Sequence, residues 1–213
     1  MTVTTCVTGF KKWALILALC VILQRSPLRA QVASGTGAVA FGLATASGNY
    51  SLAAGASTAI GVYSTAFGVC STASGYSSIS NGFLSTASGT YGMAFGAGAT
   101  AIGVNSIALG FNLTAIGPCS VALGGNSTAS GNYSTASGSY TTASGNNSTA
   151  FGHCTTASAE NSFVVGAYNV GGAGPTVSGT DPVFEIGNGY YDSTTSTAVP
   201  SDALWEMGST LEY

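Results

Sequence analysis

A glycine recurs at every seventh position along half of this chain, and this period limits what the chain can fold into. The row is Gly61, Gly68, Gly75, Gly82, Gly89, Gly96, Gly103, Gly110, Gly117, Gly124, Gly131, Gly138, Gly145, Gly152 and Gly166, and only Ala159 interrupts it. Alanine stands two residues before these positions, except at Ser80 and Val164. A repeat of fixed period indicates an architecture in which each unit packs on its neighbours.

The composition of the repeat favours short strands over helices. Glycine inside a helix costs up to about 1 kcal/mol relative to alanine, so one glycine per seven residues excludes a coiled coil. Each unit instead offers about five extended residues and a tight turn, where glycine and asparagine tolerate positive φ. The asparagines two positions after the repeat glycine are Asn105, Asn112, Asn126, Asn147 and Asn161.

Two seven-residue units form one structural coil, because the side chains follow a 14-residue period. Three residues before the glycine, one series is Thr72, Thr86, Thr100, Thr114, Thr128, Thr142 and Thr156. The alternate series is Thr65, Ile79, Met93, Ile107, Val121, Thr135, Thr149 and Phe163. Successive coils stack about 4.8 Å apart. The sequence therefore predicts an all-β, parallel solenoid of roughly ten 14-residue coils.

Alternation along each strand predicts which side chains share a face. Thr149 and Phe151 share one face, and Ser148 and Ala150 share the other. We expect the large apolar residues to fill the core, and hence the threonine row to point into the roll. These core candidates are Phe67, Phe95, Leu109, Leu123, Phe151 and Val165, with Ile102 and Ile116 on the other series.

The two ends of the chain depart from the repeat. Residues 1–30 read as a signal peptide, with Lys11 and Lys12 before an eleven-residue apolar run and cleavage after Ala30; an uncleaved signal anchor is the alternative. Residues 31–60 enter the repeat with two shortened heptads, which we place in a turn. Residues 169–213 predict a cap with strands at 183–186 and 203–207, a turn at 187–189 and a polar, carboxylate-bearing outer face.

Charge and chemistry exclude several functions. No Asp, Glu, Lys or Arg lies between Arg29 and Glu160, so nucleic acid is not expected as a partner and paired catalytic carboxylates are absent there. His153, the only histidine, lies beside Cys154 and makes half a metal site at best. We therefore expect no enzyme activity, no catalytic or metal-binding residues and no cofactor.

The cysteines of the repeat occupy equivalent turn positions. Cys70 and Cys154 lie six coils apart, about 29 Å, and Cys119 is half a coil out of phase. A disulfide needs Cα atoms within about 7 Å, so none is expected between these cysteines within one chain. Cross-linking between subunits remains an alternative to a plain turn role.

Units such as Asn105-Ser106-Ile107-Ala108-Leu109-Gly110 and Asn126-Ser127-Thr128-Ala129-Ser130-Gly131 resemble the head repeats of YadA-like trimeric autotransporter adhesins. The resemblance covers about residues 33–168. It implies a left-handed parallel β-roll that forms a homotrimer and is exported to a bacterial cell surface. The domains expected are a signal peptide at 1–30, a YadA-like head at 31–168 and a cap or neck-like segment at 169–213.

The resulting functional hypothesis is an exported structural protein that binds matrix protein or glycan through repeated contacts. The turns present Tyr50, Tyr63, Tyr76, Tyr91, Tyr133 and Tyr140. Relatives continue into a stalk and an outer-membrane anchor, which the sequence to Tyr213 does not show, so we expect secretion, retention by a partner or a truncated relative. The alternative function is an ice-binding solenoid that uses its threonine ladder, which requires threonines that face solvent.

Overall fold

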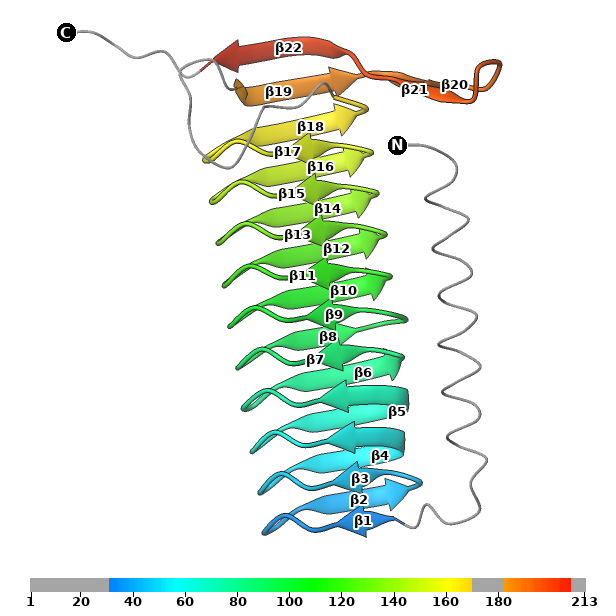
Figure 1. Ribbon diagram of the computed structural model, residues 1–213, viewed down its shortest axis with the longest axis vertical. Coiled ribbons are helices and arrows are strands. Elements are labelled where there is room, and N and C mark those ends of the chain that lie inside the picture. Colours follow the sequence, from blue (N-terminus) through cyan, green and yellow to red (C-terminus); the bar gives the residue numbers. More distant parts are fainter. Residues whose placement is uncertain (1–30, 170–181, 208–213) are drawn as a thin grey trace, which may run out of the picture.

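The chain forms an elongated solenoid (Figure 1). The computed structural model describes residues 31–169 and 182–207, so the expected signal peptide at 1–30 lies outside the described residues. The described residues form an all-β structure without a helix, with a 20-stranded sheet and one separate two-stranded sheet. A search of the same residues found no helix with the length and apolarity needed to span a membrane.

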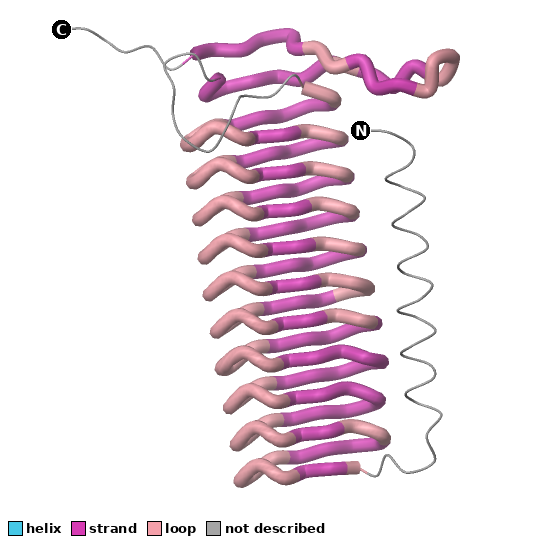
Figure 2. The backbone as a smooth tube through the Cα atoms, viewed as in Figure 1, coloured by secondary structure: helices cyan, strands magenta, loops and turns pink. Residues whose placement is uncertain are grey.

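Each coil contains one longer and one shorter strand, joined by two turns (Figure 2). The longer strands are β2 (Val39–Gly42), β6 (Ile79–Phe83), β8 (Met93–Phe95), β10 (Ile107–Phe111), β12 (Val121–Gly125), β14 (Thr135–Ser139), β16 (Thr149–His153) and β18 (Phe163–Ala167). The shorter strands are β1 (Val32–Ala33), β3 (Thr45–Ala46), β7 (Thr86–Ala87), β9 (Thr100–Ala101), β11 (Thr114–Ala115), β13 (Thr128–Ala129), β15 (Thr142–Ala143) and β17 (Thr156–Ala157). In β4 (Leu52–Ala59) and β5 (Thr65–Ala73) a single strand continues from the long to the short position.

Strand pairing confirms the 14-residue coil. Ile107 of β10 pairs in parallel with Val121 of β12, and Thr114 of β11 pairs with Thr128 of β13. The first coils are 13 residues long, because Val39 pairs with Leu52. The coil length changes from 13 to 14 residues at a register shift between β4 and β5. After Ala56, β5 has one more residue in the turn than β4. The shortened heptads therefore lie in a turn, as predicted.

The interior of the roll is filled by small side chains. Except in β1, whose two residues are exposed, each strand of the roll places at least one fully buried residue inward, and in nearly every coil it is alanine. The inward residues of the long strands are Ala40, Ala53, Ala66, Ser80, Ala94, Ala108, Ala122, Ala136, Ala150 and Val164. Serines at the ends of the turns complete the interior, among them Ser64, Ser78, Ser106, Ser120, Ser134 and Ser148.

Only some of the buried hydroxyls find local partners. Ser80, which replaces the usual alanine, lies 2.8 Å from the Ser85 hydroxyl. Ser134 donates to the Gly131 carbonyl at 2.6 Å, and Ser162 donates to the carbonyl of Ala159 at 2.7 Å. The equivalent hydroxyls of Ser64, Ser78, Ser106, Ser120 and Ser148 are buried without a hydrogen-bond partner among the described residues, so their burial costs stability that the packing of the coils must offset.

The large apolar residues face outward, and the prediction that they fill the core is wrong. Phe151 and Leu109 are about half exposed, whereas Ala150 and Ala108 beside them are fully buried. The threonine row also faces outward, with Thr114 partly exposed. Two strands and two tight turns enclose a space that only alanine, serine and a few larger residues can fill. The alternation predicted from the sequence holds, but its inner and outer faces are exchanged.

Glycine is required because successive coils approach through their backbones. Gly110 has φ +141°, and a Cβ added there would collide with the Gly124 carbonyl oxygen one coil above. Gly103, in the other series, has no unusual φ, but its Cβ would collide with the Gly117 carbonyl. Ala159, which follows β17, replaces glycine in the row. A side chain is tolerated there because no short strand stacks above β17 in the part of the chain that the structure describes.

The residue two positions after the repeat glycine adopts positive φ in nearly every coil. This confirms the prediction for the asparagines, with φ of 55° at Asn105 and 54° at Asn126. Tyrosine and cysteine take the same conformation, as Tyr140 at 57° and Cys154 at 52° show. Several asparagines also bond to one another between coils, and Asn112 Nδ2 donates to Asn126 Oδ1 at 2.7 Å.

An antiparallel pair follows the last parallel strand of the roll. β19 (Pro182–Asn188) stacks in parallel on β18, and β22 (Asp202–Met207) pairs antiparallel with β19, which confirms both predicted strands. The predicted turn at residues 187–189 is wrong. The chain runs on from β19 into β20 (Tyr190–Asp192), turns at residues 193–196 and returns as β21 (Thr197–Val199). Glu185 occupies the inward position of β19 and is buried, so it is not part of a polar outer face.

The first prediction concerns the backbone contact between coils. Gly110→Ala should lower the midpoint of thermal unfolding strongly, because it adds a backbone collision and about 1–2 kcal/mol of conformational strain. Gly125→Ala, on the neighbouring strand β12, is the matched control, since its Cβ would meet only the Phe111 carbonyl at 3.9 Å. Equal midpoints for the two variants, measured by circular dichroism, would contradict the stacking.

The second prediction concerns the β20–β21 hairpin. Asp192 accepts hydrogen bonds from the Thr194 hydroxyl at 2.6 Å and the Thr194 backbone N–H at 2.8 Å. These bonds hold the pKa of Asp192 below its ordinary value. Their stabilisation is therefore present above the unfolded pKa of about 3.9 and is lost as the pH falls through the folded pKa. Thr194→Val should raise the pKa of Asp192 in an NMR titration, whereas Ser193→Ala should leave it unchanged.

Candidate functional site

The solenoid exposes two faces and two turn edges, each built from a repeated position. The long-strand face consists of the outward residues of the long strands. The short-strand face consists of the outward residues of the short strands. The tyrosine edge consists of the turns that follow the short strands and carry Tyr50, Tyr63, Tyr76 and Tyr91, and the histidine edge consists of the turns that follow the long strands and carry His153.

The long-strand face is largely apolar and exposed. Its large apolar residues more than one-third exposed are Val39, Phe41, Val69, Phe83, Met93, Leu109, Phe111, Phe151 and Phe163. The row continues into the cap, where the ring of Phe184 stacks on Phe163 at 5.9 Å. Thr135, Ser137 and Ser139 of β14 interrupt it with one polar strand. An exposed apolar surface that extends over most of the long strands marks an interaction site.

The short-strand face carries the threonine row and, beside it, a row of serine and isoleucine. In β13, Thr128 is followed by the buried Ala129 and then by Ser130, and both hydroxyl-bearing residues face outward. Isoleucine occupies the serine position in three coils, at Ile60, Ile102 and Ile116, which are 51%, 46% and 43% exposed. This face is thus more polar than the long-strand face, and the predicted asymmetry between the two strand series is present.

Four tyrosines form a continuous ladder along the tyrosine edge. The ring centroids of Tyr50 and Tyr63 are 5.3 Å apart, those of Tyr63 and Tyr76 5.7 Å, and those of Tyr76 and Tyr91 5.8 Å. Backbone bonds between successive turns, such as Tyr91 N–H to Tyr76 carbonyl at 2.8 Å, hold the turns in register. About half of each ring remains exposed.

The position of each tyrosine in its turn decides how the rings meet. Tyr50 and Tyr63 both stand two residues after the repeat glycine, and their rings stack with planes 7° apart. Tyr76 stands one residue after its glycine, and it meets Tyr63 and Tyr91 edge to face, at 79° and 86°. Both arrangements are favourable for aromatic pairs. Tyr133 lies on the same edge outside this ladder.

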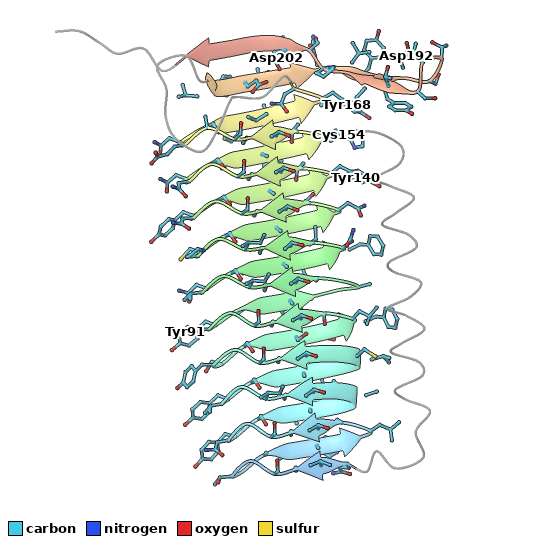
Figure 3. All side chains as sticks on the ribbon, viewed as in Figure 1. Tyr91, Tyr140, Cys154, Tyr168, Asp192 and Asp202 are labelled. Carbon is cyan, nitrogen blue, oxygen red and sulfur yellow. The ribbon has the colours of Figure 1, made fainter. Side chains whose placement is uncertain are left out.

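The histidine edge gathers four different side chains near the cap. Figure 3 shows Tyr140, Cys154 and Tyr168 along this edge, across the roll from Tyr91. His153 Nε2 lies 3.1 Å from the Tyr168 hydroxyl and 3.4 Å from the Cys154 sulfur. The His153 ring also meets Tyr140 and Tyr168 edge to face, at 6.2 and 5.2 Å between centroids.

Partial burial raises the pKa of the Cys154 thiol, and a hydrogen bond with Tyr168 acts in the opposite direction. Burial and the neighbouring Cys154 raise the pKa of Tyr168. Inspection of the sequence identified the His153–Cys154 pair but missed Tyr168. The 14-residue period carries the signal, because Tyr168 occupies the position of Cys154 one coil later.

The expectations about disulfides and metal ligands can be compared with the structure. Cys119 and Cys154 are free thiols, so neither is joined to the other or to Cys70, as expected from their separation. Among residues 31–169 and 182–207, no three His, Cys, Asp or Glu side chains gather as metal ligands. The absence of catalytic residues and of cofactors stays a prediction, and cross-linking between subunits remains an alternative.

The comparisons with known proteins agree with this geometry. A family model described as the YadA head domain repeat matches residues 59–85, 87–112, 115–141 and 143–169, about half of the chain. These segments cover the coils from the end of β4 to the turn after β18. None of the curated proteins compared with the chain matches it.

Proposed function

We propose that this chain, which belongs to the YadA head domain family, is an exported, non-enzymatic, adhesin-like protein of the bacterial surface. In this proposal it forms a homotrimer and binds matrix protein or glycan through many weak contacts. The family match supports the adhesin-like character. The tyrosine ladder is the observation that carries the binding proposal, because it repeats one exposed chemical group along successive coils.

The ladder has the chemistry of a recognition surface. Tyrosine offers an apolar ring and a polar hydroxyl at little entropic cost, which suits contact with both protein and sugar. No charged side chain occurs between residues 31 and 159, so recognition there relies on stacking and neutral hydrogen bonds. Three copies of one ladder on a trimer would multiply weak contacts through effective concentration.

The long-strand face supports the trimer. Side chains such as Leu109 and Phe111 are about half exposed in the single chain, and a monomeric protein rarely leaves so continuous an apolar surface uncovered. Packing three long-strand faces around one axis would cover it and leave the tyrosine edges free. The short-strand face, with its threonines and serines, would then meet the solvent.

The ice-binding alternative is not supported by the comparisons. The threonine row faces outward, which corrects the orientation expected from the sequence, but the family match points to an adhesin-like surface protein. Thermal hysteresis of the purified chain tests this alternative directly, and its absence would exclude it.

The third prediction tests the ladder. The double variant Tyr63→Asn, Tyr91→Asn should bind immobilised collagen or a glycan array at least about tenfold more weakly, because two of the four rings are lost. Asparagine fits the fold, since Asn105 and Asn147 take positive φ in the same turn position. Tyr133→Asn is the matched control, because Tyr133 is exposed on the same edge outside the ladder.

The control should retain the binding of the unmodified chain. Failure of the unmodified chain to bind either class of surface would overturn the adhesin proposal. Equal loss in the control and in the double variant would show that binding, if present, does not depend on the ladder.

The fourth prediction tests the trimer by sedimentation. The unmodified chain should sediment as three copies, and the double variant Leu109→Ser, Phe111→Ser should dissociate, since each large side chain contributes about 1.5 kcal/mol or more when buried. Ser137 and Ser139 occupy the same positions two coils later, so serine is compatible with the roll. Ile102→Ser, on the short-strand face, should remain trimeric. A monomeric unmodified chain, or dissociation of only the Ile102 variant, would contradict the proposed interface.

A further inference from the structure

The histidine edge brings together three donor atoms that the proposed adhesive function does not use. His153 Nε2 lies 3.4 Å from Cys154 Sγ and 3.1 Å from Tyr168 Oη, and Cys154 and Tyr168 are themselves hydrogen-bonded. The three side chains come from two adjacent coils. One imidazole nitrogen therefore has one sulfur and one phenol oxygen within 3.4 Å.

We propose that His153, Cys154 and Tyr168 form a binding site for one zinc ion per chain. Imidazole and thiolate are the donors that Zn²⁺ prefers, and a site with three protein ligands leaves the fourth position to water. The hard ions Ca²⁺ and Mg²⁺ require oxygen donors, which this edge does not offer in number.

The distances fit tetrahedral coordination. With Zn–S near 2.3 Å and Zn–N near 2.0–2.1 Å, neighbouring donors in a tetrahedron are separated by about 3.4–3.6 Å. Cys154 Sγ lies 3.4 Å and Tyr168 Oη lies 3.1 Å from His153 Nε2. Only a small outward shift of the Tyr168 phenol would bring both distances to those of a tetrahedral site. On binding, the Cys154 thiol would release its proton to water and coordinate as the thiolate, while Tyr168 would coordinate through the oxygen of its neutral phenol, and the hydrogen bonds between the donors would be lost.

The backbone around the donors is fixed by the stack of coils. Cys154 N–H donates to the Ser139 carbonyl at 2.9 Å, and Tyr168 N–H donates to the His153 carbonyl at 3.1 Å. The Tyr140 ring lies against His153 from the coil below. The donors are therefore held by rigid elements, which is the condition for a preorganised site.

The repeat supplies variants that preserve the fold. His153→Ser restores the residue found one coil below, at Ser139. Cys154→Ser changes one atom in a turn position with φ of 52°, and Ser77 takes φ of 49° in the equivalent position of the other turns. Tyr168→Phe keeps the ring against His153 and removes only the hydroxyl. Cys119→Ser is the matched control, since Cys119 is also a free turn thiol but has Pro118 in place of the histidine.

The experiment measures Zn²⁺ binding to the full, reduced chain by calorimetry, and Co²⁺ binding by the thiolate-to-metal absorption band. The unmodified chain and Cys119→Ser should bind one ion with equal affinity. His153→Ser and Cys154→Ser should lose at least about 100-fold in affinity, and Tyr168→Phe about tenfold. The Co²⁺ band should disappear only in Cys154→Ser among the cysteine variants.

Three results would overturn zinc binding by His153 and Cys154. They are the absence of Zn²⁺ binding in the unmodified chain, unchanged affinity in both His153→Ser and Cys154→Ser, and equal losses in Cys119→Ser and Cys154→Ser. An unchanged affinity in Tyr168→Phe would overturn the three-donor site. Circular dichroism of each variant confirms that the roll is intact. None of these results depends on whether the tyrosine ladder binds matrix protein or glycan.

Discussion

The contact between the backbones of successive coils is the constraint on which the rest of the structure depends. At Gly110 and Gly103 the carbonyl of the next coil occupies the place where a Cβ would lie. This contact requires glycine once per seven residues and keeps equivalent residues in register over the whole roll. Each coil buries little by itself, so stability comes from the repetition of this contact, as in other solenoids.

The narrow coil also decides where large side chains can go. Its interior holds alanine and serine, and the phenylalanines and leucines of the long strands must face outward. The rule that apolar residues lie inside assumes an interior wide enough to receive them. Here the apolar residues instead form an outer face that β14 interrupts, and in the proposed trimer this face would be covered by the other chains. The core of the functional particle would then lie between chains as well as within them.

The sequence predicted the coil, its period, the shortened first turns and the positive φ of Asn105, because these follow from local stereochemistry and spacing. The prediction of which face of a strand is inside was wrong, since alternation is symmetric and only the coil width distinguishes the faces. The supposed turn at Gly187 failed for a related reason: β19 continues the stack, and the chain reverses only after Asp192. Glycine there satisfies packing against the turn below rather than a change of direction.

In such a fold the residues of a site come from successive coils, because residues 14 apart in the sequence become neighbours in space. Tyr168 joins His153 and Cys154 only in this frame, which explains why adjacency in the sequence showed two donors and the structure shows three. The same frame explains the tyrosine ladder, where a shift of one position at Tyr76 turns a stacked pair into an edge-to-face pair. Because the coil repeats with the same glycine contacts, its turns can carry different residues along the chain, and the two edges can have different chemistry.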